Sequence, residues 1–339
     1  MDPLTHALAG AAAARVAGSR SLKAAALLPG AAGALLPDVD AFIRSSADPL
    51  LYAEFHRHFT HSLAFIPVGG FVASLPWLVR RATRSQWRAY LLAATAGYAT
   101  HGVLDAATTY GTVWFWPFSM ARVSWDAIAI VDPLFTLVLA LGLAVAVWQR
   151  SAWPATGSLV LCVAYVMAGA NARDRALVVQ QQIAAQRGHT IDRGAVFPAF
   201  ASNVLWRSLY RANGTLYMDR IRVPWAGGPA WKPGTSVPAV ELSDFAARAR
   251  TESRLAHDVS RFNWFTDAWM ARAPDDERVI ADARYSQRQD RFEPVWGIRI
   301  DVPGPVPIEW IDRSGQRRVD PRELWDEIRG ADTGYRLLE

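Results

Sequence analysis

Long apolar stretches without charge constrain the fold of this chain most. Ser62–Val79 and Trp153–Asn171 contain no charged side chain, and each approaches the about 20 residues that a helix needs to cross a bilayer. Ala89–Leu104 and Leu134–Trp148 have a similar composition. We therefore expect a mainly α protein, whose first part is a polytopic bundle of membrane helices.

The apolar segments nearest the N-terminus are shorter. Residues 4–17 and Ala24–Leu36 are helical in pattern but too short to cross a bilayer, so we expect a tilted or partly embedded hairpin. Pro37 disfavours helical geometry at Leu36, which predicts that the helix ends before Asp38 and Asp40. If the backbone is extended there, both carboxylates point to the same side.

The composition changes near Arg173, after which no apolar stretch is long enough to span. Asn213-Gly214 is a strong hairpin signal between two strand-like runs. We therefore divide the chain into a membrane-embedded helical domain, residues 1–172, and a soluble α+β domain with β-hairpins, residues 173–339. The strands expected here are Val204–Arg211, Thr215–Val223, Val279–Tyr285, Val295–Val302 and Pro307–Ile311, and short helices are expected at Asp174–Arg187 and Pro321–Ile328.

Charges segregate along the alternating apolar segments. The basic links Arg15–Lys23, Arg80–Arg88 and Arg150 fall at one end, whereas the histidines and aspartates of the first half fall at the other. The positive-inside rule makes the basic end cytoplasmic, so we expect the His/Asp residues on the extracytoplasmic side of a bacterial inner membrane. The net charge of +5 comes mainly from Arg without a basic, aromatic-rich stripe, which disfavours a nucleic-acid partner.

The stretch Glu54–Ser62 holds three of the seven histidines. On a helix, His58 and His61 would share a face, with His56 about half a turn earlier. Neutral imidazole is the commonest metal ligand, so the stretch predicts a metal site. The alternative is a set of polar residues at the membrane interface.

His101 and Asp105 have a spacing that also puts both on one face of a helix. Cys162 is the single cysteine, so a disulfide within the chain or a multi-thiolate site is excluded. Imidazole and carboxylate donors suit Zn²⁺ first, with Mn²⁺ or Fe²⁺ as alternatives, and their number allows one to three ions. The candidate ligands are His6, Asp38, Asp40, His56, His61, His101 and Asp105.

A family resemblance rests on the order of several motifs. They are Leu4-Thr5-His6-Ala7, Leu36-Pro37-Asp38-Val39-Asp40, His56-Arg57-His58-Phe59-Thr60-His61-Ser62, His101-Gly102-Val103-Leu104-Asp105, Tyr110-Gly111, Trp116-Pro117-Phe118-Ser119 and Ile130-Val131-Asp132-Pro133. Over about residues 1–150 the chain closely resembles the YdjM-type bacterial inner-membrane family of metal-dependent hydrolases. More distantly it is similar to zinc phospholipases C and single-strand nucleases, which are phosphodiesterases.

The distant resemblance implies roles for particular residues. It implies metal ligation by His6, Asp38, His61, His101 and Asp105. The later His-x-x-x-Glu of those enzymes has no clear counterpart, and the residues that could replace it are Asp40, His56, His58 and Asp126.

Candidate catalytic residues are Asp126, Asp132 and His58, although Asp132-Pro133 could equally be a helix cap. Arg57 and Arg122 could hold a phosphate through paired N–H bonds, or meet lipid headgroups.

We therefore expect a membrane-bound, metal-dependent hydrolase acting on a phosphoester of a lipid or lipid-linked molecule. One alternative is a membrane protein that binds or transports metal without hydrolysis, and another is a scaffold in which metal only holds helices together. A transporter should carry its charged groups near the bilayer midplane, whereas here they lie at one end, which favours the enzyme. The oligomeric state is left open.

Overall fold

The computed structural model describes the chain except residues 19–20, 289–290, 305, 317–319, 332–333 and 338–339. Contacts between residues divide the chain into two compact units. The first unit comprises Met1–Ile43 and Phe55–Ala170, and the second comprises Arg44–Glu54 and Asn171–Glu339. The short segment Arg44–Glu54 therefore belongs with the C-terminal half, although both of its neighbours along the chain lie in the first unit.

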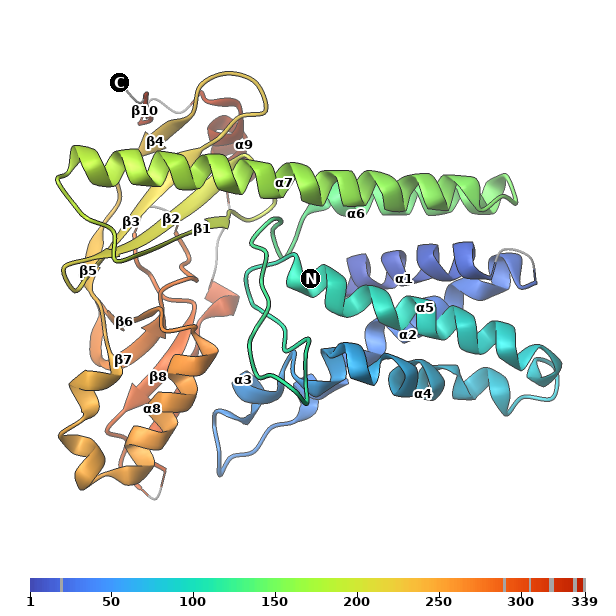
Figure 1. Ribbon diagram of the computed structural model, residues 1–339, viewed down its shortest axis with the longest axis horizontal. Helices are drawn as coiled ribbons and strands as arrows, with labels where there is room; N and C mark the ends of the chain where they lie inside the picture. Colours follow the sequence, from blue (N-terminus) through green and yellow to red (C-terminus); the bar gives the residue numbers. More distant parts are fainter. Residues whose placement is uncertain (19–20, 289–290, 305, 317–319, 332–333, 338–339) are drawn as a thin grey trace. The chain divides into compact units, whose positions relative to one another are not determined.

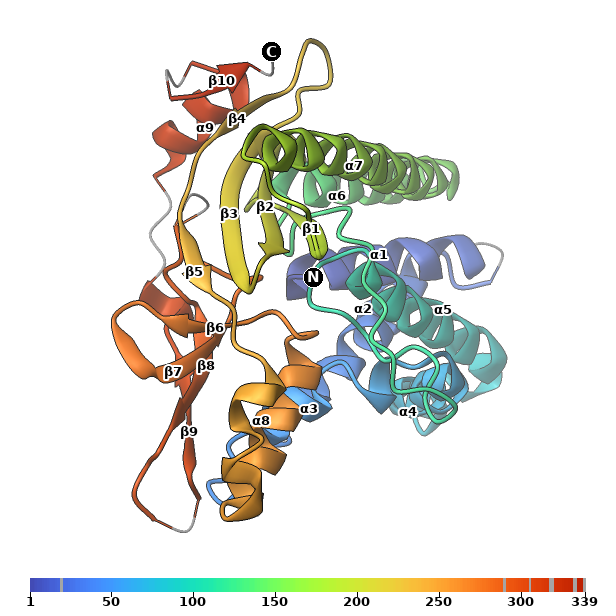
Figure 2. The same ribbon diagram turned by 60° about the vertical axis from the view of Figure 1, so that its left-hand side comes forward.

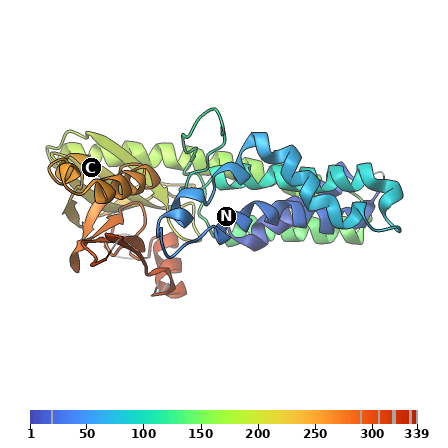
Figure 3. The same cartoon turned by 90° about the horizontal axis from the view of Figure 1, so that it is seen from below.

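The first unit is built from helices, as expected (Figure 1). The α-helices are α1 (Pro3–Ala17), α2 (Leu27–Leu35), α4 (Ile66–Leu78), α5 (Trp87–Ala106), α6 (Pro133–Trp148) and the first half of α7 (Trp153–Gln186). Short 3₁₀ helices cover Lys23–Ala26, Leu36–Phe42, Phe59–His61, Leu63–Phe65 and Arg84–Gln86. Helices α4 and α5 pack side by side (Figure 1 and Figure 3).

Two helical segments in the described part of the chain are long and apolar enough to cross a membrane, namely Lys23–Phe42 and Trp153–Gln186. A bent pair, Leu51–His61 with Leu63–Leu78, would make a third. Lys23–Phe42 is longer than the sequence suggested because 3₁₀ turns extend α2 at both ends. Helix α6, in contrast, has 16 residues and stays shorter than a full span.

Helices α1, α2 and α5 approach closely at glycines. A Cβ atom on Gly97 of α5 would lie 2.0 Å from the carbonyl oxygen of Gly30 on α2, and one on Gly10 of α1 would lie 2.5 Å from that oxygen. Small residues let membrane helices pack backbone against backbone. This contact brings together the three helices whose ends carry His6, Asp38 and His101.

The second unit contains two antiparallel sheets. The first has the order β1-β2-β3-β4-β10, with β5 also paired to β3, and the second has the order β6-β7-β8-β9. The strands are β1 (Arg193–Pro198), β2 (Leu205–Ala212), β3 (Thr215–Arg222), β4 (Ala230–Lys232), β5 (Ser236–Pro238), β6 (Met270–Ala273), β7 (Asp276–Asp282), β8 (Trp296–Ile300), β9 (Ile308–Asp312) and β10 (Arg336–Leu337). The helices are α3 (Leu51–Phe55), the second half of α7, α8 (Ser253–Phe265) and α9 (Pro321–Arg329).

The C-terminal half of α7 covers one face of the first sheet (Figure 2). Ala176, Val179 and Ile183 pack there against the buried Trp206 and Ile221. The sequence suggested a span followed by a separate helix, but α7 runs unbroken because no proline or glycine interrupts it between Asn171 and Gln186.

The predicted hairpin is confirmed, with Ala212 opposite Thr215 across the Asn213-Gly214 turn. The other predicted strands correspond to β7, β8 and β9, and the predicted C-terminal helix to α9. Sequence patterns missed the short strands β4, β5 and β10, the strands β1 and β6, and the helices α3 and α8. Strands of three residues are too short to show an alternating pattern.

Candidate metal centre

Asp38 and Asp40 lie in the 3₁₀ helix Leu36–Phe42, which follows α2 directly. Helix α2 ends at Leu35, but Leu36 keeps helical dihedral angles, with a φ of −64° and a ψ of −36°. The expectation that Pro37 excludes helical geometry there is therefore wrong, and the backbone continues as a tighter helix rather than an extended segment. The two carboxylates nevertheless converge, because Asp38 and Asp40 each bring an oxygen into a group whose ligand atoms lie within 4.8 Å of one another. Asp40 is buried, whereas the Asp38 side chain is 30% exposed.

The histidine-rich stretch is a bend rather than a helix. Arg57 has a φ of +64°, and Phe59–His61 forms a short 3₁₀ helix after it. His58, the residue before that 3₁₀ helix, has a φ of −97° and a ψ of −125°, outside the helical region, so His58 and His61 do not share a helical face, contrary to the sequence expectation. The ring of His58 instead lies 6.5 Å from the ring of Trp116, measured between centroids.

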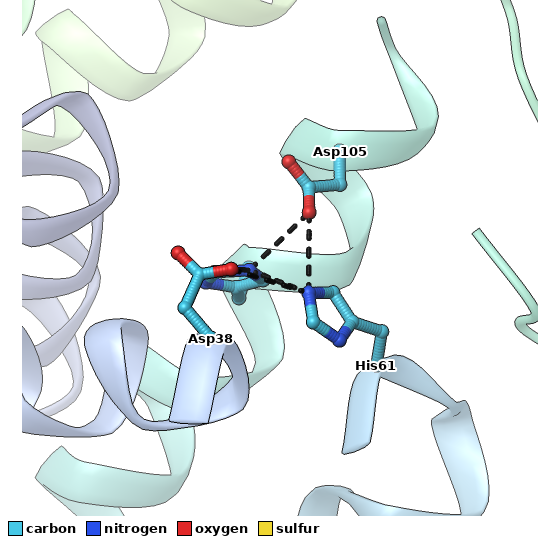
Figure 4. A group of neighbouring side chains, drawn as sticks. Asp38, His61 and Asp105 are labelled. Carbon is cyan, nitrogen blue, oxygen red and sulfur yellow. Dashed lines mark hydrogen bonds and ion pairs between the residues drawn. The ribbon is translucent and has the colours of Figure 1, made fainter. Parts of the chain in front are cut away.

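Four side chains from three segments bring one ligand atom each to a common point. They are Asp38, His61, His101 and Asp105, whose ligand atoms all lie within 4.8 Å of one another. Figure 4 shows the carboxylates of Asp38 and Asp105 turned toward the ring of His61. His61, His101 and Asp105 are buried.

The spacing of these atoms fits a tetrahedral ion. His61 Nε2 lies 3.6 Å from Asp38 Oδ1 and 3.3 Å from Asp105 Oδ2, and His101 Nε2 lies 3.4 and 3.3 Å from the same two oxygens. The two Nε2 atoms lie 2.9 Å apart. Ligands at about 2.0–2.1 Å from a tetrahedral zinc ion are about 3.3 Å from one another, so the edges match such a site closely.

Each of the two histidines in the group also has a partner at its second ring nitrogen. His101 Nδ1 donates to the backbone carbonyl oxygen of Ala34, and His61 Nδ1 lies 3.1 Å from Asp40 Oδ2. Asp40 Oδ2 also accepts a 2.7 Å hydrogen bond from the Thr60 hydroxyl. Histidines that bind metal usually donate their other N–H in this way, which fixes the tautomer and turns the lone pair toward the ion.

Asp105 is held in place by cationic and polar groups. His6 Nε2 lies 3.2 Å from Asp105 Oδ1, which also contacts the Met1 amine, and Arg57 Nε lies 3.1 Å from Oδ2. The His6 ring stacks on His101 at 3.7 Å between centroids. His6 therefore lies beside the four-residue group and supports two of its members.

A second His/Asp group shares Asp38 with the first. It consists of Asp38, Asp40 and His56, again with ligand atoms within 4.8 Å of one another. Asp40 Oδ1 lies 2.9 Å from His56 Nδ1, so this carboxylate contacts His56 through one oxygen and His61 through the other.

Two arginines gather around Tyr110. The guanidinium carbons of Arg57 and Arg122 lie 4.7 and 5.1 Å from the centre of its ring. Arg57 also donates to the Thr108 hydroxyl, and Arg122 donates to the Gly111 carbonyl oxygen. The sequence pointed to both arginines, and the fold brings them to the same aromatic ring.

The remaining candidates lie outside both His/Asp groups. Asp132 caps α6, accepting from the Phe135 amide through Oδ1 and from the Tyr165 hydroxyl through Oδ2. This is the helix-cap role left open by the sequence. Asp126 has a φ of +49° in the loop before α6, and neither it nor His58 belongs to either group.

Ala34, Thr60 and the Met1 amine contribute to the site and were missed from the sequence. Ala34 and Met1 act through backbone atoms, which leave no signal in the side chain. The Thr60 hydroxyl contacts both Asp40 and His61 Nδ1, and only its position next to His61 could have suggested a role.

A known protein family matches the part of the chain that holds this arrangement. The profile of the YdjM inner membrane protein family matches residues 1–176, which contain every residue of both His/Asp groups. No curated protein and no solved structure matches the chain. Because the family match extends over more than half of the sequence, the chain belongs to the YdjM inner membrane protein family.

Proposed function

We propose that this protein is a multi-pass inner-membrane hydrolase that uses a divalent metal ion, zinc in the first instance, to hydrolyse a phosphoester. Its substrate would be a membrane lipid or a lipid-linked molecule. The observation that carries the proposal is the near-tetrahedral set of His61, His101, Asp38 and Asp105, with both imidazoles oriented from behind. Two imidazoles and two carboxylates also suit Mn²⁺ or Fe²⁺.

The residues around the site have chemistry that suits phosphoester hydrolysis. An ion held by the four-residue group would lower the pKa of a bound water and polarise a phosphoryl oxygen. The Asp38 side chain is 30% exposed whereas the other three ligands are buried, so water and substrate would enter beside it. Arg57, next to Asp105, is the candidate to pair with a phosphate oxygen.

The contacts of Asp40 also favour one residue for proton transfer. Asp40 holds His56 at Nδ1, as an acid orients an imidazole for general acid–base work. We therefore favour His56 over His58, Asp126 and Asp132 for holding and moving the proton. The group formed by Asp38, Asp40 and His56 could alternatively hold a second ion.

The arrangement of charge along the candidate span Lys23–Phe42 supports an extracytoplasmic site. Lys23 lies at its start, and Asp38 and Asp40 lie near its end. This helical segment has 20 residues, about the number that a helix needs to cross the hydrocarbon core. With the basic end in the cytoplasm, the metal centre would face the other side, where lipid headgroups are in reach.

A non-catalytic metal site is the competing function. Four protein ligands are what a closed structural zinc site has, whereas catalytic zinc sites keep one position open. The test is metal analysis of the purified full chain, combined with assays on phospholipids and chromogenic phosphodiesters, for wild type, His101→Ala and the matched control His189→Ala. We expect stoichiometric metal and metal-dependent turnover in wild type and control, and neither in His101→Ala. Metal binding without turnover on any phosphoester would favour the structural role, and absence of bound metal would reject both functions.

A further inference from the structure

The segment Arg44–Glu54 connects the two halves of the metal centre. It follows the 3₁₀ helix that carries Asp38 and Asp40, and it precedes the bend that carries His56 and His61. Its contacts nevertheless place it in the second unit, with the sheets and α8. A part of the second unit is thus inserted between the ligand-bearing segments of the chain.

Arg261 of α8 holds this segment at two points, Asp48 near its middle and Glu54 at its end. Its Nη1 and Nη2 donate to the two carboxylate oxygens of Asp48 at 3.0 and 2.9 Å. Its Nε and Nη2 donate to Glu54 Oε2 at 2.8 and 2.5 Å. We call Arg261, Asp48 and Glu54 the clasp.

The clasp has features that separate it from an ordinary surface ion pair. The Arg261 side chain is only 16% exposed, and its Nη1 also contacts Asp258 at 3.3 Å. The bond to Asp48 is bidentate, the geometry in which Arg–carboxylate pairs are strongest. Burial raises the pKa of Asp48, but the hydrogen bonds from Arg261 outweigh this effect, so that the pKa lies below its usual value.

We propose that Arg261 is a positioning residue for the metal centre, which acts by fixing the segment between Asp40 and His56. The inference rests on the proposed metal site. A free connecting segment would have to lose conformational entropy each time the ligands assemble around an ion, whereas a segment already fixed at Asp48 and Glu54 has lost it beforehand. The C-terminal unit thereby raises the metal affinity of residues that belong to the N-terminal unit.

The test compares zinc affinity in full-length variants by competition with a chelating dye. Arg261→Gln keeps much of the side chain's length and removes the charge, and we expect zinc binding on the order of fivefold weaker or more, the lower end of usual coupling effects. Arg254→Gln is the matched control, because Arg254 lies on the same helix and pairs with Asp258. Among the interactions of the described residues it forms no hydrogen bond or ion pair with Asp48 or Glu54, and it acts on Asp48 only through its charge. This control should retain wild-type affinity.

A double-mutant cycle separates positioning from a general loss of stability. Glu54→Gln should weaken zinc binding as Arg261→Gln does, and the double variant should be little weaker than either single variant, because both remove the same contact. If Arg261→Gln does not fold, Asp48→Asn and Glu54→Gln break the clasp from the other side.

If Arg261→Gln and Glu54→Gln bind zinc with wild-type affinity while His101→Ala loses binding, the positioning role of Arg261 is rejected and the metal site is retained. Absence of zinc binding by the wild-type protein would overturn both.

Discussion

Asp40 lies behind the candidate metal ligands and contacts them through its carboxylate. One of its oxygens contacts His61 Nδ1 and the Thr60 hydroxyl, and the other contacts His56 Nδ1. Its neighbour Asp38, two residues earlier, belongs to the four-residue group and, with Asp40 and His56, to the second group. Asp38 is thus the residue that the two groups share.

Asp40→Asn is expected to weaken metal binding about 10–100-fold, the usual effect of losing a partner behind a ligating histidine. The amide keeps the shape of the carboxylate but loses its charge, so the orientation of His61 is less strongly favoured. Chelator competition measures the change, and Asp174→Asn, at an exposed surface residue, is the control. Unchanged affinity in Asp40→Asn would show that His61 does not depend on this contact.

Helices α2 and α5 bring the candidate ligands Asp38 and His101 close together because the two helices pack without side chains between them. Gly97 and Gly30 meet with almost no space for a methyl group, and Gly33 of α2 packs as closely on the carbonyl oxygen of Ala94. The opposing atoms are backbone, which cannot move aside as a flexible side chain can. The separation of these two helices therefore fixes how far Asp38 lies from His101.

Gly97→Ala is expected to destabilise the first unit by about 1–3 kcal/mol or more, because the added methyl overpacks a backbone contact. Gly157→Ala on α7 is the matched control, since a Cβ there meets nothing within 4 Å and alanine favours a helix by up to about 1 kcal/mol. Unfolding of both variants in detergent measures the difference. Equal stabilities would mean that α2 and α5 are less tightly packed than described.

At the scale of the whole molecule, the candidate metal centre joins segments from Asp38 to Asp105, and its four residues lie outside both sheets. A ligand that binds the folded state alone stabilises it by about 2.7 kcal/mol at one hundred times its dissociation constant. Binding of metal should therefore stabilise the first unit more than the sheets of the second.

Removal of metal by a chelator is expected to raise hydrogen exchange in Leu36–Phe42, in Phe59–His61 and at the end of α5. Exchange in β2 and β3 should change little, because these strands contribute no ligand. Mass spectrometry of peptides, with and without chelator, gives both readings in one experiment. An equal change in hydrogen exchange in both units after removal of metal would argue against a metal centre confined to the first unit.

Membrane orientation can be tested because the chain has a single cysteine, Cys162. In a Cys162→Ser background, Ser119→Cys follows the ligand-bearing end of α5, and Arg81→Cys lies in the basic link before that helix. Arg81 is exposed and Ser119 is half-buried. We expect an impermeant maleimide to label Ser119→Cys from outside the inner membrane, and Arg81→Cys only after permeabilisation. The opposite pattern would place the metal centre in the cytoplasm.

The sequence by itself determined the composition of this protein's parts: apolar helices first, a hairpin-containing domain second, and a set of His and Asp residues at one end of the apolar segments. These features are local, since hydropathy, the Asn213-Gly214 turn and the capping by Asp132 depend on neighbouring residues. Only the tertiary structure decided which imidazoles and carboxylates meet, because the 3₁₀ turn after Pro37, the positive φ of Arg57 and the contact of Gly30 with Gly97 set their directions and distances. It also decided that Arg261, far along the chain, holds the segment between the ligands, since packing between distant residues leaves no periodic pattern in a single sequence.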